Sequence, residues 1–307
     1  MAGFIGSHLA RRLADRGAEV VGLDNFDETL YPAALHRRNL ECAGNARLVS
    51  GDILDPKLLD SLVGQGPDAI VHLAGLAGVR PSIAEPHRYQ QVNIAGTLNI
   101  LEACRKHRVS RLVFASSSSV YGTSSQVPFC ESDPADRPAS PYAATKRAGE
   151  LLCANYAQLF GIASTALRFF TVYGPRQRPE MAIHKFARLI LDGQTVPLFG
   201  DGSTARDYTF VDDIIDGVVA AIDRCDGGVY RVYNLGGSRT TTLKQLVELL
   251  QAGLGKPAKI EWLPDQPGDV PITYADVSKA QTELGYAPRV PIEDGVARFC
   301  AWVKEQT

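Results

Sequence analysis

A tyrosine and a lysine four residues apart, Tyr142 and Lys146, stand in the segment Tyr-Ala-Ala-Thr-Lys. At that spacing both side chains lie on the same face of a helix, about one turn apart. A free tyrosine loses its proton near pH 10, too high for a base at neutral pH, but a neighbouring ammonium group lowers this pKa. Tyr142 is therefore a candidate general base that takes a proton from a hydroxyl group.

A run of serines from Ser116 to Ser119 precedes this pair. A hydroxyl group from the run could bridge Tyr142 to a reacting oxygen atom. The tyrosine–lysine spacing alone also occurs by chance in many helices, so it predicts a catalytic site only together with its sequence context.

Short apolar segments alternate with amphipathic helical segments through the first half of the chain. The predicted strands are nearly continuous runs of Val, Ile, Leu and Ala, which is typical of strands buried on both faces of a parallel sheet; they lie at residues 19–23, 47–51, 68–74, 111–116 and 164–170. The predicted helices lie at residues 5–16, 56–63, 87–107 and 142–160. Repeated strand–helix units predict an α/β fold with a doubly wound parallel sheet and right-handed crossovers.

The sequence changes character after Gly174 and Pro175. Shorter predicted helices and strands alternate there with proline-rich turns; the helices lie at residues 181–192, 211–224, 242–254 and 292–304, and the strands at residues 196–199 and 229–235. We expect two domains: residues 1–174 form the doubly wound domain, and residues 175–307 form mainly a smaller α/β lobe that is partly interleaved with it.

The chain opens with Gly3 and Gly6 and then enters a predicted helix. Glycines at a helix N-terminus let a phosphate group approach the free amides, where the helix dipole favours an anion. Asp24 ends the next predicted strand, and a carboxylate there suits the 2′-hydroxyl of NAD and repels the 2′-phosphate of NADP. This segment predicts an NAD site, although by itself it also fits a simple glycine turn before a helix.

A complete dinucleotide fingerprint needs one more glycine and a preceding strand, and neither stands before Gly3. That first strand would lie in the middle of a Rossmann-like sheet. Loss of its buried apolar residues would cost on the order of 10 kcal/mol, comparable with the stability of a whole domain. We therefore expect the natural chain to begin several residues earlier.

Composition narrows the class of protein. A net charge of −2 gives no electrostatic reason to expect nucleic acid or an anionic membrane as partner. The six cysteines are scattered without a CxxC motif, which favours reduced thiols and a cytoplasmic location. The six histidines lack metal-binding spacing, so no metal is expected. No apolar run approaches the roughly 20 residues of a membrane span.

These segments together resemble the extended short-chain dehydrogenase/reductases, specifically the nucleotide-sugar epimerase group. The resemblance covers essentially the whole chain and rests on AGFIGSHL (2–9), LDNF (23–26), GDILD (51–55), VHLAGLAGVRPS (71–82), VNIAGTLNILEAC (92–104), FASSSSVYG (114–122), SPYAATK (140–146), LRFFTVYGPRQRPEM (167–181), RDYTFVDD (206–213) and QPGDVPITYADVSKA (266–280). The segments at residues 167–181 and 266–280 are together more similar to UDP-glucuronate 4-epimerases than to UDP-galactose 4-epimerases.

The resemblance implies a role for each candidate residue. Tyr142 would be the catalytic base, Lys146 would lower its pKa and hold the nicotinamide ribose, and Ser117 matches the catalytic serine or threonine of the family. The cofactor would be NAD, bound by Gly3, Phe4, Ile5, Gly6, Asp24, Asn25, Asp52, Ile53, Leu73, Ala74, Gly75, Asn93, Ser116, Tyr142, Lys146 and Phe169. The substrate would be a UDP-sugar, bound by Ser117, Ser118, Tyr142, Thr171, Arg178, Arg206, Asp269 and Arg80.

Two serines separate this sequence from the sister reactions of the family. All these relatives first oxidise the sugar at C4, and 4,6-dehydratases then eliminate water with an Asp-Glu pair, where this chain has Ser118 and Ser119. Decarboxylases have a glutamate in place of Ser119. A serine cannot hold a proton with a pKa near 7, so the resemblance implies an epimerase that returns the hydride to the other face of a 4-keto intermediate.

The sequence departs from the pattern of the UDP-galactose 4-epimerases at two substrate-binding positions. UDP-galactose 4-epimerases usually have an arginine where this chain has Gln266, and an asparagine where it has Thr171. The leading hypothesis is a UDP-glucuronate 4-epimerase in which Arg178 binds the sugar carboxylate. The alternatives are that Arg178 is a loop arginine paired with local acids, or that Arg80 binds the carboxylate. Other hypotheses are a 4-epimerase of UDP-glucose and UDP-galactose or of UDP-pentoses, and a non-catalytic NAD-binding regulator.

Relatives of this group pair two long helices across a two-fold axis. Here residues 87–107 and 142–160 have apolar residues beyond one core-facing stripe, including Leu98, Leu151 and Leu159. A homodimer is therefore expected.

Overall fold

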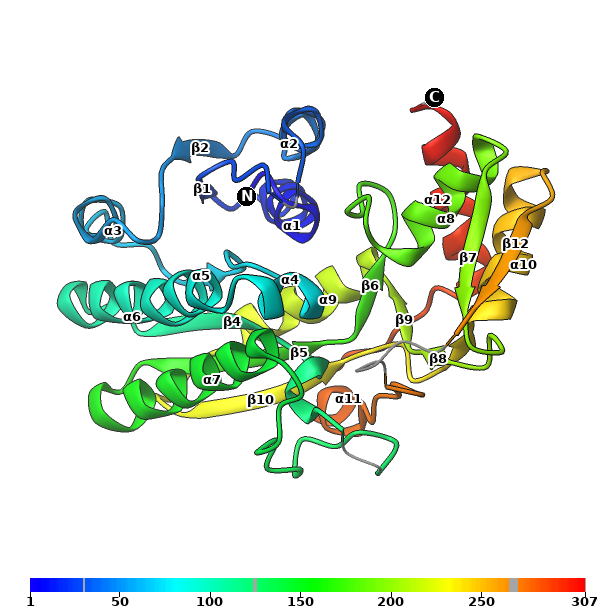
Figure 1. The fold of residues 1–307 in the computed structure, drawn as a ribbon. Helices are drawn as coiled ribbons and strands as arrows, with labels where there is room; N and C mark the ends of the chain where they lie inside the picture. Colours follow the sequence, from blue (N-terminus) through cyan, green and yellow to red (C-terminus); the bar gives the residue numbers. More distant parts are fainter. Residues whose placement is uncertain (30, 124–125, 265–269, 307) are drawn as a thin grey trace.

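Four parallel strands form the central sheet in the order β10-β5-β4-β3 (Figure 1). They are β3 (Ile70–His72), β4 (Arg111–Ser117), β5 (Ala163–Phe169) and β10 (Tyr230–Leu235). The computed structural model describes residues 1–29, 31–123, 126–264 and 270–306. All seven side chains of β5, and all but the first of β4, are buried, which confirms the predicted parallel sheet covered on both faces.

A second pair of parallel strands, β1 (Val21–Asp24) and β2 (Arg47–Ser50), stands apart from the central sheet. Among the described residues no strand joins β1 to β3. The amino group of Met1 instead donates a hydrogen bond to the carbonyl oxygen of Leu23, at 3.1 Å. The strands of this pair are only partly buried, unlike β4 and β5.

Helices complete the strand–helix units of this half. The helices α1 (Phe4–Asp15), α3 (Pro56–Val63) and α7 (Pro141–Phe160) form close to their predicted bounds. The helices α2 (Ala33–Cys42) and α4 (Val79–Ala84) were not predicted.

The segment predicted as one helix at residues 87–107 has three parts. They are α5 (Pro86–Gln90), a π-helical turn, η1 (Gln91–Ala95), and α6 (Gly96–His107). The π turn contains Asn93, whose carboxamide is drawn toward the loop after β3 by two hydrogen bonds with Leu76, at 2.8 and 3.0 Å. Such turns often occur at functional sites because they redirect one side chain without ending the helix.

The start of α7 is fixed by local chemistry. The hydroxyl oxygen of Ser140 accepts a hydrogen bond from the amide of Ala143, and Pro141 occupies the first helical turn. At Gly149 the helix lies directly on β4, because a Cβ atom there would come within 2.4 Å of the Phe114 ring. This close approach sets Tyr142 and Lys146 beside the carboxyl end of β4.

Most elements of the second half of the chain form a smaller group beside one end of the sheet, whereas the helix α9 (Val211–Asp223) packs on β4 and β5 next to α1 (Figure 1). The other helices are α8 (Ala182–Leu191), α10 (Leu243–Leu254), α11 (Ser278–Leu284) and α12 (Ile292–Lys304). The strands are β6 (Thr171–Tyr173), β7 (Thr195–Phe199), β8 (Ala205–Arg206), β9 (Tyr208–Phe210), β11 (Thr241–Thr242) and β12 (Lys259–Leu263). The strand β10 returns from this half into the central sheet, beside β5.

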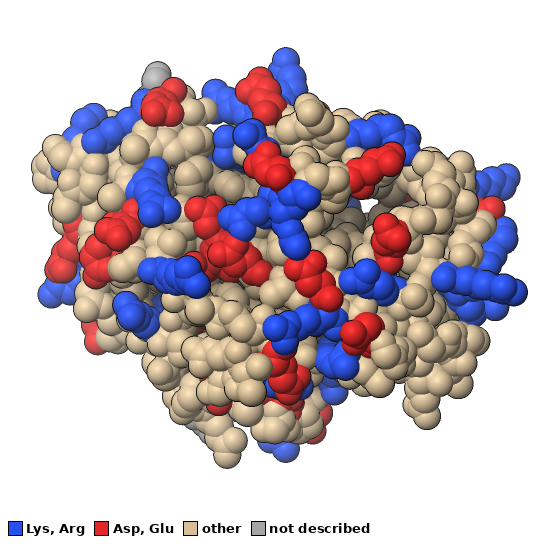
Figure 2. All heavy atoms as spheres, turned by 180° about the vertical axis from the view of Figure 1, so that it is seen from behind, with Lys and Arg blue, Asp and Glu red and all other residues tan. Residues whose placement is uncertain are grey.

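The surface is electrostatically mixed. Figure 2 shows basic and acidic side chains interspersed on the face turned away from the viewer in Figure 1, in keeping with the small net charge. Within the described part of the chain, none of the helices combines the length and apolar character needed to cross a bilayer.

Candidate active site

A cavity of about 540 Å³ opens at the carboxyl ends of β1 to β5. In doubly wound folds this edge of the sheet is where ligands bind. The walls are formed by the first turn of α1, the loops after β1, β2 and β3, the end of β4, the first turns of α7 and the segment from Phe169 to Met181.

Most of the candidate residues meet in this cavity. Those that line it are Gly3, Phe4, Ile5, Gly6, Asp24, Asn25, Asp52, Ile53, Leu73, Ala74, Gly75, Ser116, Ser117, Ser118, Tyr142, Lys146, Phe169, Thr171 and Arg178. Asn93, Arg80 and Arg206 are not part of its lining. Asp269 lies outside the described residues, as does Gln266.

The candidate base Tyr142 lies beside Ser117. Burial raises the pKa of Tyr142, while a hydrogen bond with the Ser117 side chain and the positive charge of Arg178 act in the opposite direction. The hydroxyl of Ser117 also donates to the hydroxyl oxygen of Ser119, at 3.1 Å. The ring of Tyr89 packs edge-on against Tyr142, with 6.3 Å between the ring centroids.

Lys146 lies one turn further along α7 and is buried. Its Nζ donates to the carbonyl oxygen of Ala115, at 2.9 Å, and lies 5.2 Å from the centroid of the Phe114 ring. Burial lowers the pKa of Lys146 to about 8. The positive charge that acts on Tyr142 in this structure is that of Arg178, so the expected influence of Lys146 on the tyrosine stays a prediction.

Gly75, in the loop after β3, lies close to Lys146 and to Asn93 of the π turn η1. Gly75 has φ +154°, and a Cβ atom there would lie 3.0 Å from Oδ1 of Asn93 and 3.3 Å from Nζ of Lys146. Asn93 bonds to Leu76 and, through Nδ2, to the hydroxyl of Thr145, at 3.0 Å. Asn93 therefore ties the loop after β3 to α7 without lining the cavity itself.

Ser116 lines the cavity, but its hydroxyl group points to a buried ion pair. It donates to Oε1 of Glu150, at 2.6 Å, and both oxygens of that carboxylate accept from Arg168, at 2.9 Å each. This network fixes the end of β4, which carries Ser117, against α7, which carries Tyr142.

The first turn of α1 fits the phosphates of a dinucleotide. No side chain caps this helix, so its first amides are available to an anion. A Cβ atom at Gly3 would meet no atom within 4 Å, which leaves open space at this position.

Asp24, at the end of β1, has less free capacity to accept a hydrogen bond from a ribose hydroxyl, because both of its carboxylate oxygens already accept hydrogen bonds. Its Oδ2 accepts from the amino group of Met1 and the amide of Ala2, at 2.9 and 2.8 Å, and Oδ1 accepts from the amide of Phe26, at 3.0 Å. Burial raises its pKa, but the N-terminal ammonium and these hydrogen bonds outweigh burial and hold the pKa below its usual value.

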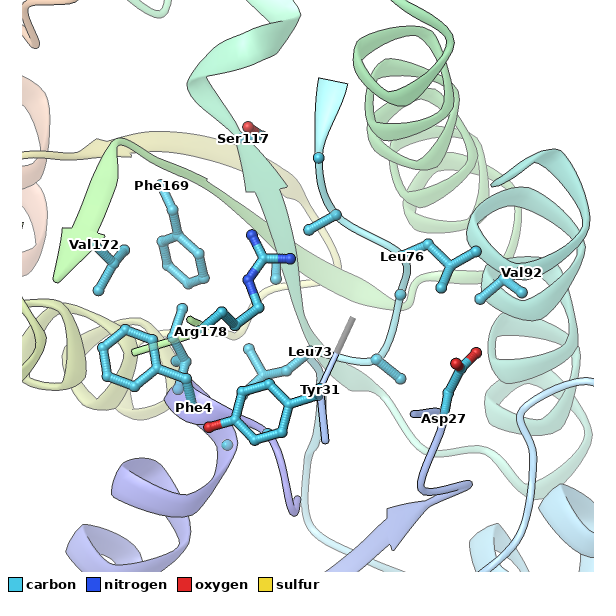
Figure 3. Close-up of a pocket in the computed structure, with 18 of the residues that line it drawn as sticks. Phe4, Asp27, Tyr31, Leu73, Leu76, Val92, Ser117, Phe169, Val172 and Arg178 are labelled. Carbon is cyan, nitrogen blue, oxygen red and sulfur yellow. The ribbon is translucent and has the colours of Figure 1, made fainter. Parts of the chain in front are cut away.

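Arg178 brings a positive charge into the cavity. Its side chain extends between Phe169 and Leu76, and its guanidinium group points toward the end of β4 (Figure 3). Nε pairs with Glu180 at 3.2 Å, which is the pairing with a local acid that the alternative for this residue predicts, and Nη2 contacts Sδ of Met181 at 3.5 Å. Arg178 nevertheless also lines the cavity.

Comparison with known proteins identifies the family. Residues 1–236 match the model of the NAD-dependent epimerase/dehydratase family. This chain belongs to that family. UDP-glucuronate 4-epimerase 1 of Arabidopsis thaliana is 42% identical over 98% of this chain and 74% of its own.

Two solved structures of the epimerase family are similar over nearly the whole chain. UDP-glucuronic acid 4-epimerase of Bacillus cereus, in complex with UDP-glucuronic acid and NAD, has a TM-score of 0.91 and 38% identity, covering 100% of this chain and 98% of that one. UDP-glucose 4-epimerase of Thermotoga maritima, with UDP-glucose, has a TM-score of 0.90 and 32% identity, covering 99% and 97%.

These findings confirm that the protein is an enzyme of the epimerase class with NAD as its cofactor. The roles of single residues stay predictions. Asp27, Tyr31, Gln177 and Met181 are among the further cavity residues that were not predicted. They lie in loops, where no periodicity marks a side chain that faces a site.

Proposed function

We propose that this enzyme interconverts UDP-glucuronate and UDP-galacturonate by inverting C4 of the sugar. The single observation that supports this proposal is the guanidinium of Arg178 in the same cavity as Ser117 and Tyr142. A uronate has a carboxylate at C5, next to the reacting carbon, and a guanidinium is suited to bind a carboxylate. The names of the Arabidopsis and Bacillus relatives agree with this substrate.

Bound NAD would supply a hydride acceptor that later returns the hydride. Tyr142 would take the proton of the C4 hydroxyl and return it after the sugar has turned over. Ser117, which lines the same cavity as Tyr142, would hold the reacting oxygen. Lys146 would support the phenolate by its charge and, through its bond to Ala115, keep a fixed position.

Two competing reactions, elimination of water and decarboxylation, start from the same 4-keto intermediate. Elimination of water needs an acid and a base near the transient ketone, and Ser118 and Ser119 supply neither. The 4-keto form of a uronate is a β-keto acid and loses CO2 when its carboxylate bond aligns with the carbonyl π system. Arg178, with Thr171 and the serine hydroxyls, would hold the carboxylate out of that alignment.

The remaining contacts of the substrate are further proposals. Arg206, on β8, would bind the diphosphate; here its Nη1 donates to the carbonyl oxygen of Ala205, at 3.0 Å. Arg80, whose guanidinium lies 5.9 Å from the centroid of the Phe199 ring, is the second candidate ligand of the sugar carboxylate, and Asp269 would also bind the substrate. We further propose a cytoplasmic homodimer that pairs through α6 and α7, where Leu98, Leu151 and Leu159 are exposed.

Product analysis tests the proposal. The NAD-loaded enzyme is incubated separately with UDP-glucuronate, UDP-glucose and UDP-xylose, and the sugars are followed by NMR. The proposal expects UDP-galacturonate from UDP-glucuronate at a rate well above that of the other two reactions. Faster conversion of UDP-glucose would assign the enzyme to the UDP-glucose class, and a pentose product from UDP-glucuronate would make it a decarboxylase.

A further inference from the structure

Three consecutive carbonyl groups just before Arg178 are each bound by a ring side chain from a different part of the chain. His8 of α1 contacts the carbonyl oxygen of Pro175 at 3.1 Å, Tyr31 donates to that of Arg176 at 2.7 Å, and His184 of α8 contacts that of Gln177 at 2.6 Å. A carbonyl oxygen only accepts, so the ring nitrogens in these contacts are donors. We call His8, Tyr31 and His184 the three anchoring side chains.

The anchored backbone contains a residue in a sparsely populated conformation. Arg176 has φ +71°, which residues other than glycine rarely adopt and which persists only where the surroundings impose it. The turn has a hydrogen bond of its own, from the amide of Gln177 to the carbonyl oxygen of Gly174 at 3.1 Å, and Nε2 of Gln177 donates to the carbonyl oxygen of Val172 at 3.0 Å. The three anchoring side chains add hydrogen bonds from outside the turn.

Tyr31 is itself fixed by a second residue. Nδ2 of Asn39, on α2, donates to the hydroxyl oxygen of Tyr31 at 2.6 Å and to the carbonyl oxygen of Ala2 at 2.7 Å. The tyrosine hydroxyl accepts one hydrogen bond and donates the other, so its proton points to Arg176. Tyr31 lines the cavity beside Arg178 (Figure 3).

We propose that the three anchoring side chains are positioning residues that set the selectivity of the cavity for an anionic sugar, by holding the turn that presents Arg178. The inference rests on the proposed function of Arg178 as the ligand of the sugar carboxylate. Without the anchors the Arg176 turn relaxes toward ordinary backbone geometry, and the guanidinium moves away from the carboxylate position. Binding of a neutral UDP-sugar does not use that contact and changes little.

Calorimetry on the NAD-loaded full chain tests this inference, with every variant made in a Tyr142→Phe background so that the sugar stays unreacted. The quantity measured is the ratio of the Kd of UDP-glucose to the Kd of UDP-glucuronate. Tyr31→Phe keeps the ring and removes only the hydroxyl, and we expect it to lower this ratio about fivefold, the factor that corresponds to one net hydrogen bond. His184→Leu should lower the ratio similarly, whereas His184→Asn, which retains a donor near the position of Nδ1, should keep it within about twofold.

Two references separate the possible outcomes. Tyr286→Phe removes another buried hydroxyl-to-carbonyl bond, to Gly236 at 2.9 Å, and should leave the ratio unchanged. Arg178→Ala should abolish the preference for UDP-glucuronate over UDP-glucose. If Arg178→Ala leaves the ratio of the two Kd values unchanged, the proposed function and this inference are both overturned. If Arg178→Ala removes the preference but Tyr31→Phe and His184→Leu retain it, or weaken both ligands equally, only the positioning role is refuted.

Discussion

At the scale of single residues, the proposed chemistry depends on Tyr142. Its ring is packed against Tyr89, and replacement by phenylalanine keeps this ring contact and removes only the proposed acid–base group. We expect Tyr142→Phe to lower kcat by at least about 10³-fold and to leave NAD binding intact. Single-turnover assays with the NAD-loaded variant, beside calorimetric measurement of NAD affinity, check this. A variant that retains a tenth of the wild-type rate would mean that another group is the base.

The pKa of Lys146 gives a prediction about stability and pH. Burial lowers this pKa to about 8 from 10.5, so between those values the unfolded chain holds a proton that the folded chain has released. Stability therefore rises with pH across this window, by at most about 3 kcal/mol relative to a Lys146→Met variant, which lacks the group. Urea unfolding of both cofactor-free proteins between pH 7.5 and 10.5 measures the difference. Curves that stay parallel would show that the ammonium of Lys146 is not disfavoured by burial.

The side chains of the proposed catalytic site could be predicted from the sequence more easily than the contacts around them. Tyr142 and Lys146 were paired because they are one helical turn apart, and Ser117 was identified by the resemblance of its segment. All three line one cavity. Ser116 was expected to contact the cofactor, yet its hydroxyl bonds to Glu150, because that partner is brought to it only by the packing of α7 on β4. Tyr31 has no local pattern at all, since its partner Arg176 lies in a distant loop.

At the scale of elements, the loop after β3 requires glycine at position 75. Alanine there would have a strained backbone, and its Cβ atom would press on Asn93 and Lys146. We expect Gly75→Ala to cost about 1–3 kcal/mol of stability and to reduce turnover by at least about tenfold. Gly161→Ala is a matched control, because Gly161 also has positive φ (+68°) but its added Cβ atom meets no atom within 4 Å.

Denaturant unfolding and steady-state kinetics of both glycine variants separate strain from a direct effect on the site. Similar losses of stability with loss of turnover in Gly75→Ala alone would support the role of the loop. Equal turnover in the two variants would contradict it.

Elements with clear periodicity or continuous apolar runs were predictable, and short ones were not. The strands β4 and β5 were predicted from their apolar runs, and α7 was predicted at residues 142–160, close to its observed bounds. The π turn that contains Asn93 was predicted as ordinary helix, because its cause is a pair of hydrogen bonds to Leu76 in another loop. The short strands β6, β8, β9 and β11 have two or three residues each, too few for a period of two to be recognised.

At the scale of the whole molecule, the exposed apolar side chains of α6 and α7 bear on assembly. Leu151 and Leu159 on α7 are 55% and 61% exposed, and Leu98 on α6 is 38% exposed. We expect the Leu151→Glu/Leu159→Glu double variant to convert a homodimer into a monomer, because two carboxylates would have to be buried unpaired. Light scattering after gel filtration gives the mass, and Ile260→Glu, on exposed β12, is a control that should leave it unchanged. A wild-type chain that is monomeric would refute the proposed pairing.

The arrangement of the whole sheet was partly predictable. A parallel α/β fold follows from the alternation of strands and helices. The position of β10 beside β5 could not be deduced, because the sequence of a strand in the second half does not indicate which sheet it joins.

The central claim is that a single hydride leaves C4 and returns to C4 of the same sugar while Tyr142 exchanges the hydroxyl proton. The direct measurement uses UDP-glucuronate with deuterium at C4 and the NAD-loaded enzyme in ordinary water, with the product followed by NMR. We predict UDP-galacturonate that retains deuterium at C4 and no net formation of NADH. Product in which C4 has lost its deuterium to solvent, or stoichiometric accumulation of NADH, would contradict the account.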